Sequence, residues 1–238
     1  MILRRVVFVA SLMLAAPLIA AEEEADDPLA GNVKFGYLAT TGNTETSSLN
    51  TSFEAAYTAG RWVHEAMASA INASENKVTT AEAYEAGWKS GWDMTDRDFV
   101  FGRLNWRKDR FGGFDTQFSQ TIGYGRHIID TDAHLLDGEL GFGARQSKDQ
   151  LGVTQNETIA TGALKYKWKF SDTSEFGQAL RVEVGGDNTF SESVTSISAK
   201  LIGSLNLVAS YTIRNNSDVP VGTEKTDTRT AISLEYVF

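Results

Sequence analysis

The chain holds few residues of the kinds that carry out chemistry. Its three histidines are His64, His127 and His134, and it has no cysteine. Hydrolysis by a serine nucleophile needs a histidine beside the hydroxyl, and none of the three histidines has a serine two residues away. Without cysteine there is no disulfide, thiolate metal site or lipid-anchored N-terminal cysteine. We therefore predict no catalytic residue, and we predict that the protein is not an enzyme.

Two polar stretches have the residue types of a metal site. Across one predicted turn the candidate ligands are His127, Asp130, Asp132 and His134. In the loop "NNSDVPVGTEKTD" they are Asp218, Glu224 and Asp227. The loop lacks the regular ligand spacing of a calcium loop, and polar residues are common in turns. We interpret both stretches as solvated surface, and predict no metal and no cofactor.

Composition narrows the partners and the kind of fold. The formal net charge is −9 at pH 7, whereas a surface that binds phosphates must be basic, so nucleic acid is not expected as a partner. Twenty-one glycines against three prolines favour tight turns and strands over helices.

The first residues are typical of an export signal. Arg4 and Arg5 precede an apolar core, residues 6–19, that is too short to span a bilayer comfortably. Cleavage is expected near Ala20 or Ala21, and the alternative is an N-terminal membrane anchor. The predicted organisation is a secretory signal peptide at 1–21, an acidic periplasmic lead-in at 22–30 and one domain at 31–238.

The elements that must position any functional side chain are segments of alternating polar and apolar residues. After residue 21 no stretch approaches 18 consecutive apolar residues, and none sustains a helical apolar stripe. The twelve predicted strands are 31–40, 48–59, 61–74, 80–93, 97–107, 114–128, 133–145, 156–170, 174–186, 192–202, 204–214 and 227–238.

The breaks between these segments alternate in length. Short breaks such as 171–174 are followed by longer ones such as 74–79, 146–155 and 215–227. An even number of antiparallel strands with short turns at one end and longer loops at the other is typical of an outer-membrane barrel. The predicted fold class is therefore all-β: a transmembrane antiparallel up-and-down β-barrel of about 12 strands in the bacterial outer membrane, with periplasmic termini.

One face of the predicted strands is apolar and the other is charged. Leu164 and Trp168 share one parity, whereas Lys165 and Lys167 share the other, because side chains alternate along a strand. A charge near the middle of the lipid face would cost about 2–4 kcal/mol, so the charged face should line the lumen. The predicted lumen-facing residues are Glu85, Lys89, Asp137, Glu139, Lys165, Lys167, Lys169, Arg181, Glu183 and Glu235. Two departures are Gln120, on an otherwise apolar face, and 61–74, which shows little alternation.

Aromatic residues concentrate near the short turns, where amphipathic rings suit the membrane interface. The predicted interface aromatics are Tyr57, Trp62, Trp92, Phe99, Phe170 and Phe176. The chain ends on "AISLEYVF", in which alternate residues are apolar. We expect this strand to pair with 31–40, so that no edge stays unpaired in lipid. It also resembles the C-terminal signal read by the outer-membrane insertion machinery, with signal residues Ile232, Leu234, Tyr236 and Phe238.

Four stretches resemble a known family. They are "FGYLATTGNTETSSLN" (35–50), "RKDRFGGFDTQFSQTIGYGRHIIDTD" (107–132), "KYKWKFSDTSEF" (165–176) and "YTIRNNSDVPVGTEKTDTRTAISLEYVF" (211–238). Together they resemble the YdiY-like family of salt-induced outer-membrane proteins, whose domain has no established function. The resemblance implies a barrel in a Gram-negative outer membrane. It brings no functional residue to this chain.

Three classes of function remain open for such a barrel. Eight strands leave an interior filled by side chains and sixteen to eighteen leave an open channel, so twelve is a borderline size. The first class is a narrow passive channel for small hydrophilic solutes with an envelope or salt-stress role. The second is a non-conducting structural or stress-response barrel with a charge-paired, filled lumen, and the third, less favoured, is a lipid-active enzyme. The expected partners are outer-membrane lipid, the insertion machinery and, for a channel, small solutes.

Overall fold

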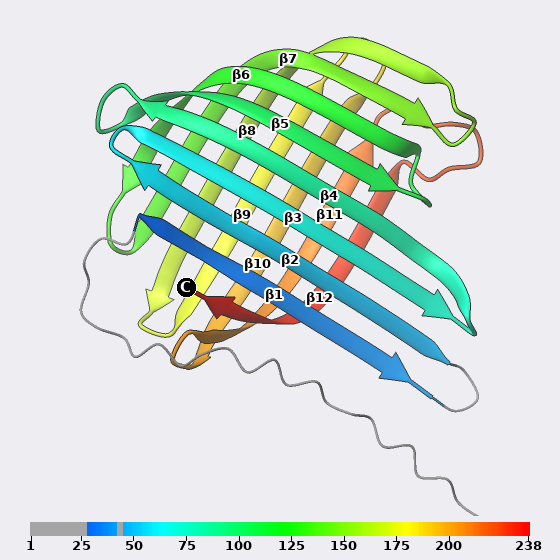
Figure 1. Ribbon diagram of the computed structural model, residues 1–238, viewed down its shortest axis with the longest axis horizontal. Coiled ribbons are helices and arrows are strands. Elements are labelled where there is room, and N and C mark those ends of the chain that lie inside the picture. The colour runs from blue at the N-terminus through cyan, green and yellow to red at the C-terminus, as the bar shows by residue number, and fades with distance from the viewer. Residues whose placement is uncertain (1–27, 42–44) are drawn as a thin grey trace, which may run out of the picture.

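The computed structural model describes residues 28–41 and 45–238, which form a closed barrel of antiparallel strands (Figure 1). The strands are β1 (Leu29–Thr40), β2 (Thr46–Ala59), β3 (Trp62–Glu75), β4 (Val78–Asp93), β5 (Asp98–Asp109), β6 (Phe114–Asp130), β7 (His134–Asp149), β8 (Thr154–Ser171), β9 (Ser174–Val184), β10 (Thr189–Ile202), β11 (Leu205–Asn216) and β12 (Thr226–Val237). Each strand pairs with its neighbours in the chain. The predicted fold class is therefore confirmed.

The barrel closes where the first and last strands meet. β1 pairs with β12 over Asn32–Phe35 and Leu234–Val237. The ladder is extended by mutual backbone hydrogen bonds between Gly31 and Phe238, at 2.8 and 3.0 Å. The C-terminal residues therefore have hydrogen-bonded neighbours on both sides. This matters because unpaired backbone groups at a strand edge in lipid are costly. The predicted signal peptide, its cleavage site and most of the lead-in lie outside the described residues.

The strands are amphipathic because polar and apolar residues alternate along them. In the β7–β8 ladder Asp137 lies opposite Lys165, and Leu136 lies opposite Tyr166. Successive side chains point to opposite faces, so the charged pair faces the lumen and the apolar pair faces outward.

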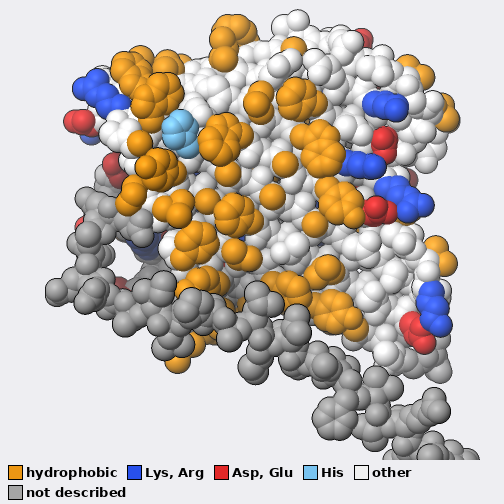
Figure 2. Space-filling view, in the orientation of Figure 1, with side chains coloured by type: hydrophobic (Ala, Val, Ile, Leu, Met, Phe, Trp, Pro, Cys, Tyr) orange, Lys and Arg blue, Asp and Glu red, His pale blue; other side chains and the backbone are white. Residues whose placement is uncertain are grey.

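The outer surface is dominated by exposed apolar side chains. Leu140, Phe142 and Ile232 are 72%, 62% and 65% exposed. Figure 2 shows hydrophobic side chains over most of the visible wall, with charged side chains mainly toward its two ends. So large an apolar exterior suits contact with lipid. Among the described residues, no helix is long and apolar enough to cross a membrane.

The turns differ from the prediction at one end of the barrel. We expected a long loop at 74–79, but the β3–β4 connection is a two-residue turn with positive φ at Asn76 (48°) and Lys77 (67°). Similarly, the expected break at 146–155 shrinks to four residues between Asp149 and Thr154. Both predictions were wrong for the same reason. A run of polar residues predicts a loop, yet ladder hydrogen bonds form equally well with polar side chains beyond the apolar band.

Phe99 was predicted to lie at the membrane interface, and the structure places it elsewhere. It is 5% exposed and packs inside the barrel, against His127 at 5.1 Å between ring centroids. Its ring covers Gly125, where a Cβ atom would overlap it. Phe99 has the parity of Arg103, not that of the outward Leu104, so alternation along β5 places it inside.

Candidate functional site

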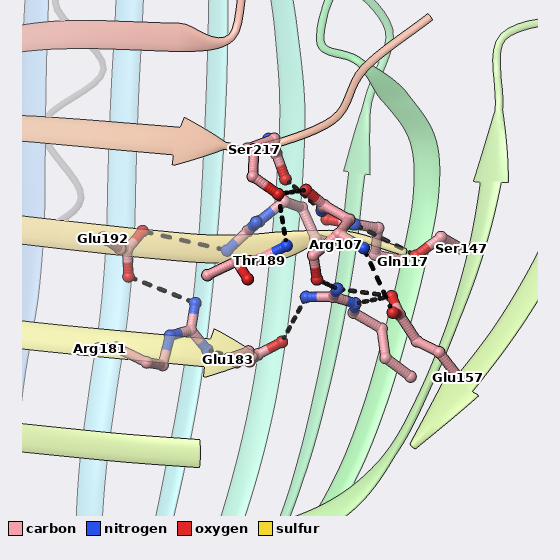
Figure 3. A network of polar contacts seen from close by, with 12 residues as sticks. Arg107, Gln117, Ser147, Glu157, Arg181, Glu183, Thr189, Glu192 and Ser217 are labelled. Carbon is pink, nitrogen blue, oxygen red and sulfur yellow. Dashed lines mark hydrogen bonds and ion pairs between the residues drawn. The ribbon is translucent and has the colours of Figure 1, made fainter. Parts of the chain in front are cut away.

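The most charged part of the lumen is a cluster of five side chains from five strands. We call it the arginine layer: Glu85 on β4, Arg107 on β5, Arg181 on β9, Glu192 on β10 and Arg214 on β11. Glu192 contacts all three arginines: its carboxylate oxygens lie 2.5 Å from Arg214 Nε, 3.3 Å from Arg181 Nη2 and 4.0 Å from Arg107 Nη2. Figure 3 shows Glu192 and Arg181 reaching toward each other from neighbouring strands.

The arginine layer crosses the lumen. Glu85 Oε1 lies 2.5 Å from Arg214 Nη1 and 3.0 Å from Arg107 Nε. β4 and β11 are not neighbours in the barrel order, so the pair Glu85–Arg214 joins separate parts of the wall. The ring of Phe190 lies among the arginines, with its centroid 4.3 Å from Arg107 Cζ and 5.2 Å from Arg181 Cζ. These contacts hold the guanidinium groups by charge and by their attraction to the ring face.

A fourth arginine links this layer to the rim of the barrel through Glu183, which also lies 3.6 Å from Arg181. Arg145 on β7 is 1% exposed. Its guanidinium lies 2.5 Å from Glu157 and 3.3 Å from Glu183, and it donates to the backbone oxygen of Asn188. Glu157 and Glu183 are both labelled in Figure 3, where they lie close to each other near the end of β9. Arg145 therefore ties the β9–β10 turn to the lumen wall.

A smaller network occupies another level of the lumen. Lys89 Nζ lies 2.8 Å from Glu139 and 3.1 Å from Glu65, and Arg103 also pairs with Glu139. Lys89 Nζ is 5.0 Å from the centroid of the Phe99 ring. Opposite charges are again matched within the wall, so this level carries little net charge.

Of the remaining predicted charged residues, the three lysines of β8 are exposed, whereas Glu235 is buried. Lys167 is 45% exposed at its side chain and lies 3.8 Å from Glu175. Lys165 and Lys169 have the same parity on β8 as Lys167 and are also exposed. Glu235 lies 3.5 Å from Lys34, whereas Asp137 lies 2.7 Å from His127. The ten residues predicted to face the lumen thus come from one face of the wall but do not form one site.

Little space remains at the arginine layer. The cavity there has a volume of about 30 Å³ and is lined by Arg107, Gln117 and Phe190, among others. That is room for a water molecule or two, and too little for a solute. The side chains of the arginine layer therefore narrow the lumen at this level.

Sequence reasoning missed several members of these networks. Arg107, Arg145, Glu157, Glu192 and Arg214 were not among the predicted residues. The alternation of residues could have placed two of them in the lumen. Arg107 alternates with Trp106, and Arg214 with Ile213, along strands predicted to have one apolar face. The sequence could not predict that these side chains contact one another, because the distance between β4 and β11 depends on how the barrel closes.

The polar turn between β6 and β7 does not gather its ligand-type residues. His127 points to the lumen and Asp137, whereas His134 points outward, with its Nδ1 2.8 Å from the hydroxyl of Tyr166. Within residues 28–41 and 45–238, no group of three His, Asp or Glu side chains is placed to hold a metal ion.

One serine does lie beside a histidine, across two strands. His64 Nδ1 is 2.9 Å from Ser90 Oγ on the outer surface, and Trp88 Nε1 donates to the same hydroxyl at 2.9 Å. His64 is also stacked against the rings of Trp62 and Trp88. Within the described part of the chain, no carboxylate contacts this histidine, so it lacks the third group that orients a catalytic base.

The other predicted outer-face residues lie at one end of the barrel or at its C-terminus. Tyr57, Trp62 and Phe170 are 47%, 48% and 46% exposed, and Trp92 pairs with Trp62 across the β3–β4 ladder. Phe176 pairs with Trp168 across β8 and β9. Three residues of the predicted insertion signal share the outer face of β12, Ile232, Leu234 and Tyr236, and Phe238 follows the strand directly; all four are exposed.

Comparison with known proteins gives a family and a fold. The family model described as "Protein of unknown function, DUF481" matches residues 33–238. The "Uncharacterized protein YdiY" of Escherichia coli (strain K12) is 33% identical over 215 residues, covering 89% of this chain and 84% of that protein.

Solved structures that resemble the chain are outer-membrane barrels. The NanC porin matches with a TM-score of 0.52 and 10% identity, over 87% of this chain and 98% of its own. The COG4313 outer membrane channel from Pseudomonas putida F1 matches with a TM-score of 0.53 and 10% identity, over 91% of this chain and 100% of its own. At such low identity the likeness concerns the fold alone.

Proposed function

Since the chain belongs to the family described as "Protein of unknown function, DUF481", whose description assigns no activity, we propose a function on the basis of the structure of the lumen. The protein is a narrow passive channel of the outer membrane for small hydrophilic solutes, and it is closed at the arginine layer. Membership in this family also confirms the YdiY-like resemblance read from the sequence.

The observation that carries this proposal is the charge of the layer that closes the lumen. Glu85, Glu192 and three arginines meet across the barrel. A barrel that only needed a solid interior would be at least as stable with apolar side chains of similar volume, because buried ion pairs lose much of their attraction to desolvation. A charged layer can instead take up water when its pairs separate, and so can open a polar path. The barrels it resembles include proteins described as a porin and an outer membrane channel.

The test is conductance through planar bilayers, with one variant that weakens the closure. Glu192→Gln removes the acid that contacts all three arginines of the layer. We expect the wild type to conduct weakly, and the variant to conduct several-fold more and to favour anions, because repelling guanidinium groups then line the path.

A matched control removes the same charge outside the lumen. Glu82→Gln breaks an ion pair at the rim, in which Glu82 Oε2 lies 3.0 Å from Arg110 Nη1. The side chain of Arg110 is 61% exposed. It should leave conductance unchanged. If wild type and Glu192→Gln both insert fully yet neither conducts, the channel is refuted and the non-conducting, charge-paired barrel takes its place. The small cavity at the arginine layer favours that second candidate.

The cellular role that we propose is in the envelope under salt stress. The support is the resemblance noted in the sequence, together with a closure built of ion pairs, which salt weakens where water reaches them. A strain lacking the gene should grow more slowly at high salt. Normal growth there would contradict this role without affecting the channel.

We also propose that the barrel is not a lipid hydrolase, although Ser90 and His64 are in contact. The Ser90 hydroxyl is held by Trp88, and the histidine has no orienting carboxylate within the described residues. Purified protein should release no fatty acid from phospholipid vesicles. Release that disappears in Ser90→Ala would overturn this conclusion.

A further inference from the structure

A polar side chain lies without a partner on the lipid-facing wall. Gln120 on β6 is exposed on the outer face, between Phe118 and Ile122 along its strand. Its cross-strand neighbours are Leu104 and Ala144. Within the described residues its amide makes no hydrogen bond. An unpaired amide in hydrocarbon costs several kcal/mol, so some partner should meet it in the membrane.

A second glutamine on the same outer face is satisfied within the wall. The Gln178 amide nitrogen donates to Ser193 Oγ at 3.0 Å, and its oxygen accepts from Thr195 Oγ1 at 2.7 Å. The wall can therefore meet the needs of a lipid-facing glutamine by itself. At Gln120 it does not.

The surface around Gln120 is hollowed. A groove of about 660 Å³ runs across β4 to β7, with Gly102, Gln120 and Ala144 among its lining residues. Larger apolar side chains stand beside them: Leu104, Ile122 and Phe142 are 46%, 57% and 62% exposed. The face thus combines a hollow, projecting apolar side chains and an unpaired amide.

We propose that this face is an interface between two copies of the chain, in which the two Gln120 amides pair across a two-fold axis. An amide has both a donor and an acceptor, so two glutamines related by such an axis can satisfy each other with two hydrogen bonds. The projecting apolar side chains of one copy would fill the groove of the other. An acyl chain would fill the groove as well but has no polar atom to offer the amide, so lipid alone leaves Gln120 unpaired.

Two readouts test the dimer. Sedimentation in detergent micelles should show that the wild type is a dimer. The dissociation constant of the dimer should be about tenfold higher in Gln120→Leu, because one or two polar hydrogen bonds in a membrane contribute an energy of that size. The matched control, Gln178→Leu, changes a lipid-facing glutamine at another place and should leave the constant unchanged.

Cross-linking in the intact membrane provides the second readout. The chain has no cysteine, so Gln120→Cys and Gln178→Cys each introduce a single thiol. A short thiol-specific cross-linker suits the first position, because an amide pair separates the backbones by more than a disulfide spans. Efficient dimer formation at position 120 and not at 178 supports the interface.

Two results would overturn the proposal. One is equal cross-linking at positions 120 and 178, or none at either. The other is an unchanged oligomeric state in Gln120→Leu, accompanied by loss of a bound lipid seen in native mass spectrometry of the wild type, which would make the groove a lipid site instead.

Discussion

At the scale of single residues, buried charge is the feature that sets this barrel apart from one filled by apolar side chains. Arg145 and Glu183 are 1% and 5% exposed, and Glu157 is also held against Arg145 at 2.5 Å. Each of these charges depends on its partners, because water cannot replace them. Removing one partner should therefore cost far more than the pair itself contributes.

Arg145→Met tests this dependence with a side chain of similar length. It leaves Glu157 and Glu183 facing each other without the guanidinium, and we expect the free energy of unfolding to fall by about 3–5 kcal/mol. Unfolding by guanidinium chloride, with the barrel inserted in lipid vesicles, measures this change in the free energy of unfolding. Arg110→Met, at an exposed pair with Glu82, should cost less than about 1 kcal/mol. Equal effects of the two substitutions would show that Arg145 is not held as described.

At the scale of elements, the turns decide how each pair of strands is joined. The β3–β4 connection uses two residues with positive φ, Asn76 and Lys77. This conformation matches the twist of the flanking strands and favours Asn followed by Gly. Lysine at the second position is strained, since a Cβ atom is disfavoured in that region.

Lys77→Gly should therefore stabilise the hairpin. The gain in the free energy of unfolding is expected to be about 0.5–1 kcal/mol, because relief of strain is partly offset by the greater freedom of glycine in the unfolded chain. The same unfolding experiment in vesicles measures it. Lys108→Gly, within the regular strand β5, serves as the control and should destabilise. A loss of stability in Lys77→Gly would refute the turn geometry.

At the scale of the whole molecule, closure makes the wall continuous. The seam depends on Gly31 and Phe238, whose backbone groups bond to each other in both directions. Phe238 also stacks on Tyr236 at the outer surface, with ring centroids 6.5 Å apart. Closure and the aromatic terminus therefore involve the same residue.

A closed barrel should resist detergent until it is heated. Unboiled protein is expected to migrate faster than boiled protein on gels, because the intact ladder stays compact. Deletion of Phe238 should reduce the fast-migrating fraction, since it removes both backbone hydrogen bonds and the terminal ring. Phe238→Tyr keeps both and should behave like the wild type. Unchanged folding in the deletion variant would mean that the seam closes without its last residue.

Most of the strands, and the faces that they present, could be predicted from the amino-acid sequence. Alternation along the chain suffices for this, because it is a local property of an extended backbone. It placed Lys165 in the lumen and Leu164 outside, in the register found between β7 and β8. The prediction was wrong where polar strands continue beyond the apolar band, as at Asp149, and at Phe99, an aromatic residue near a short turn whose side chain faces the lumen.

The contacts between inward side chains could not be predicted from the sequence, because they depend on how the barrel closes. Glu85 and Arg214 are far apart in the chain and lie on strands that are not neighbours, yet closure of the barrel brings them to 2.5 Å. Lys167 lies 3.8 Å from Glu175 of the neighbouring strand β9, whereas Glu183 of the same strand pairs with Arg145 of β7. Alternation specifies the face of a side chain but not its position around the ring. Curvature and register set that position, and with it whether the lumen is open or closed.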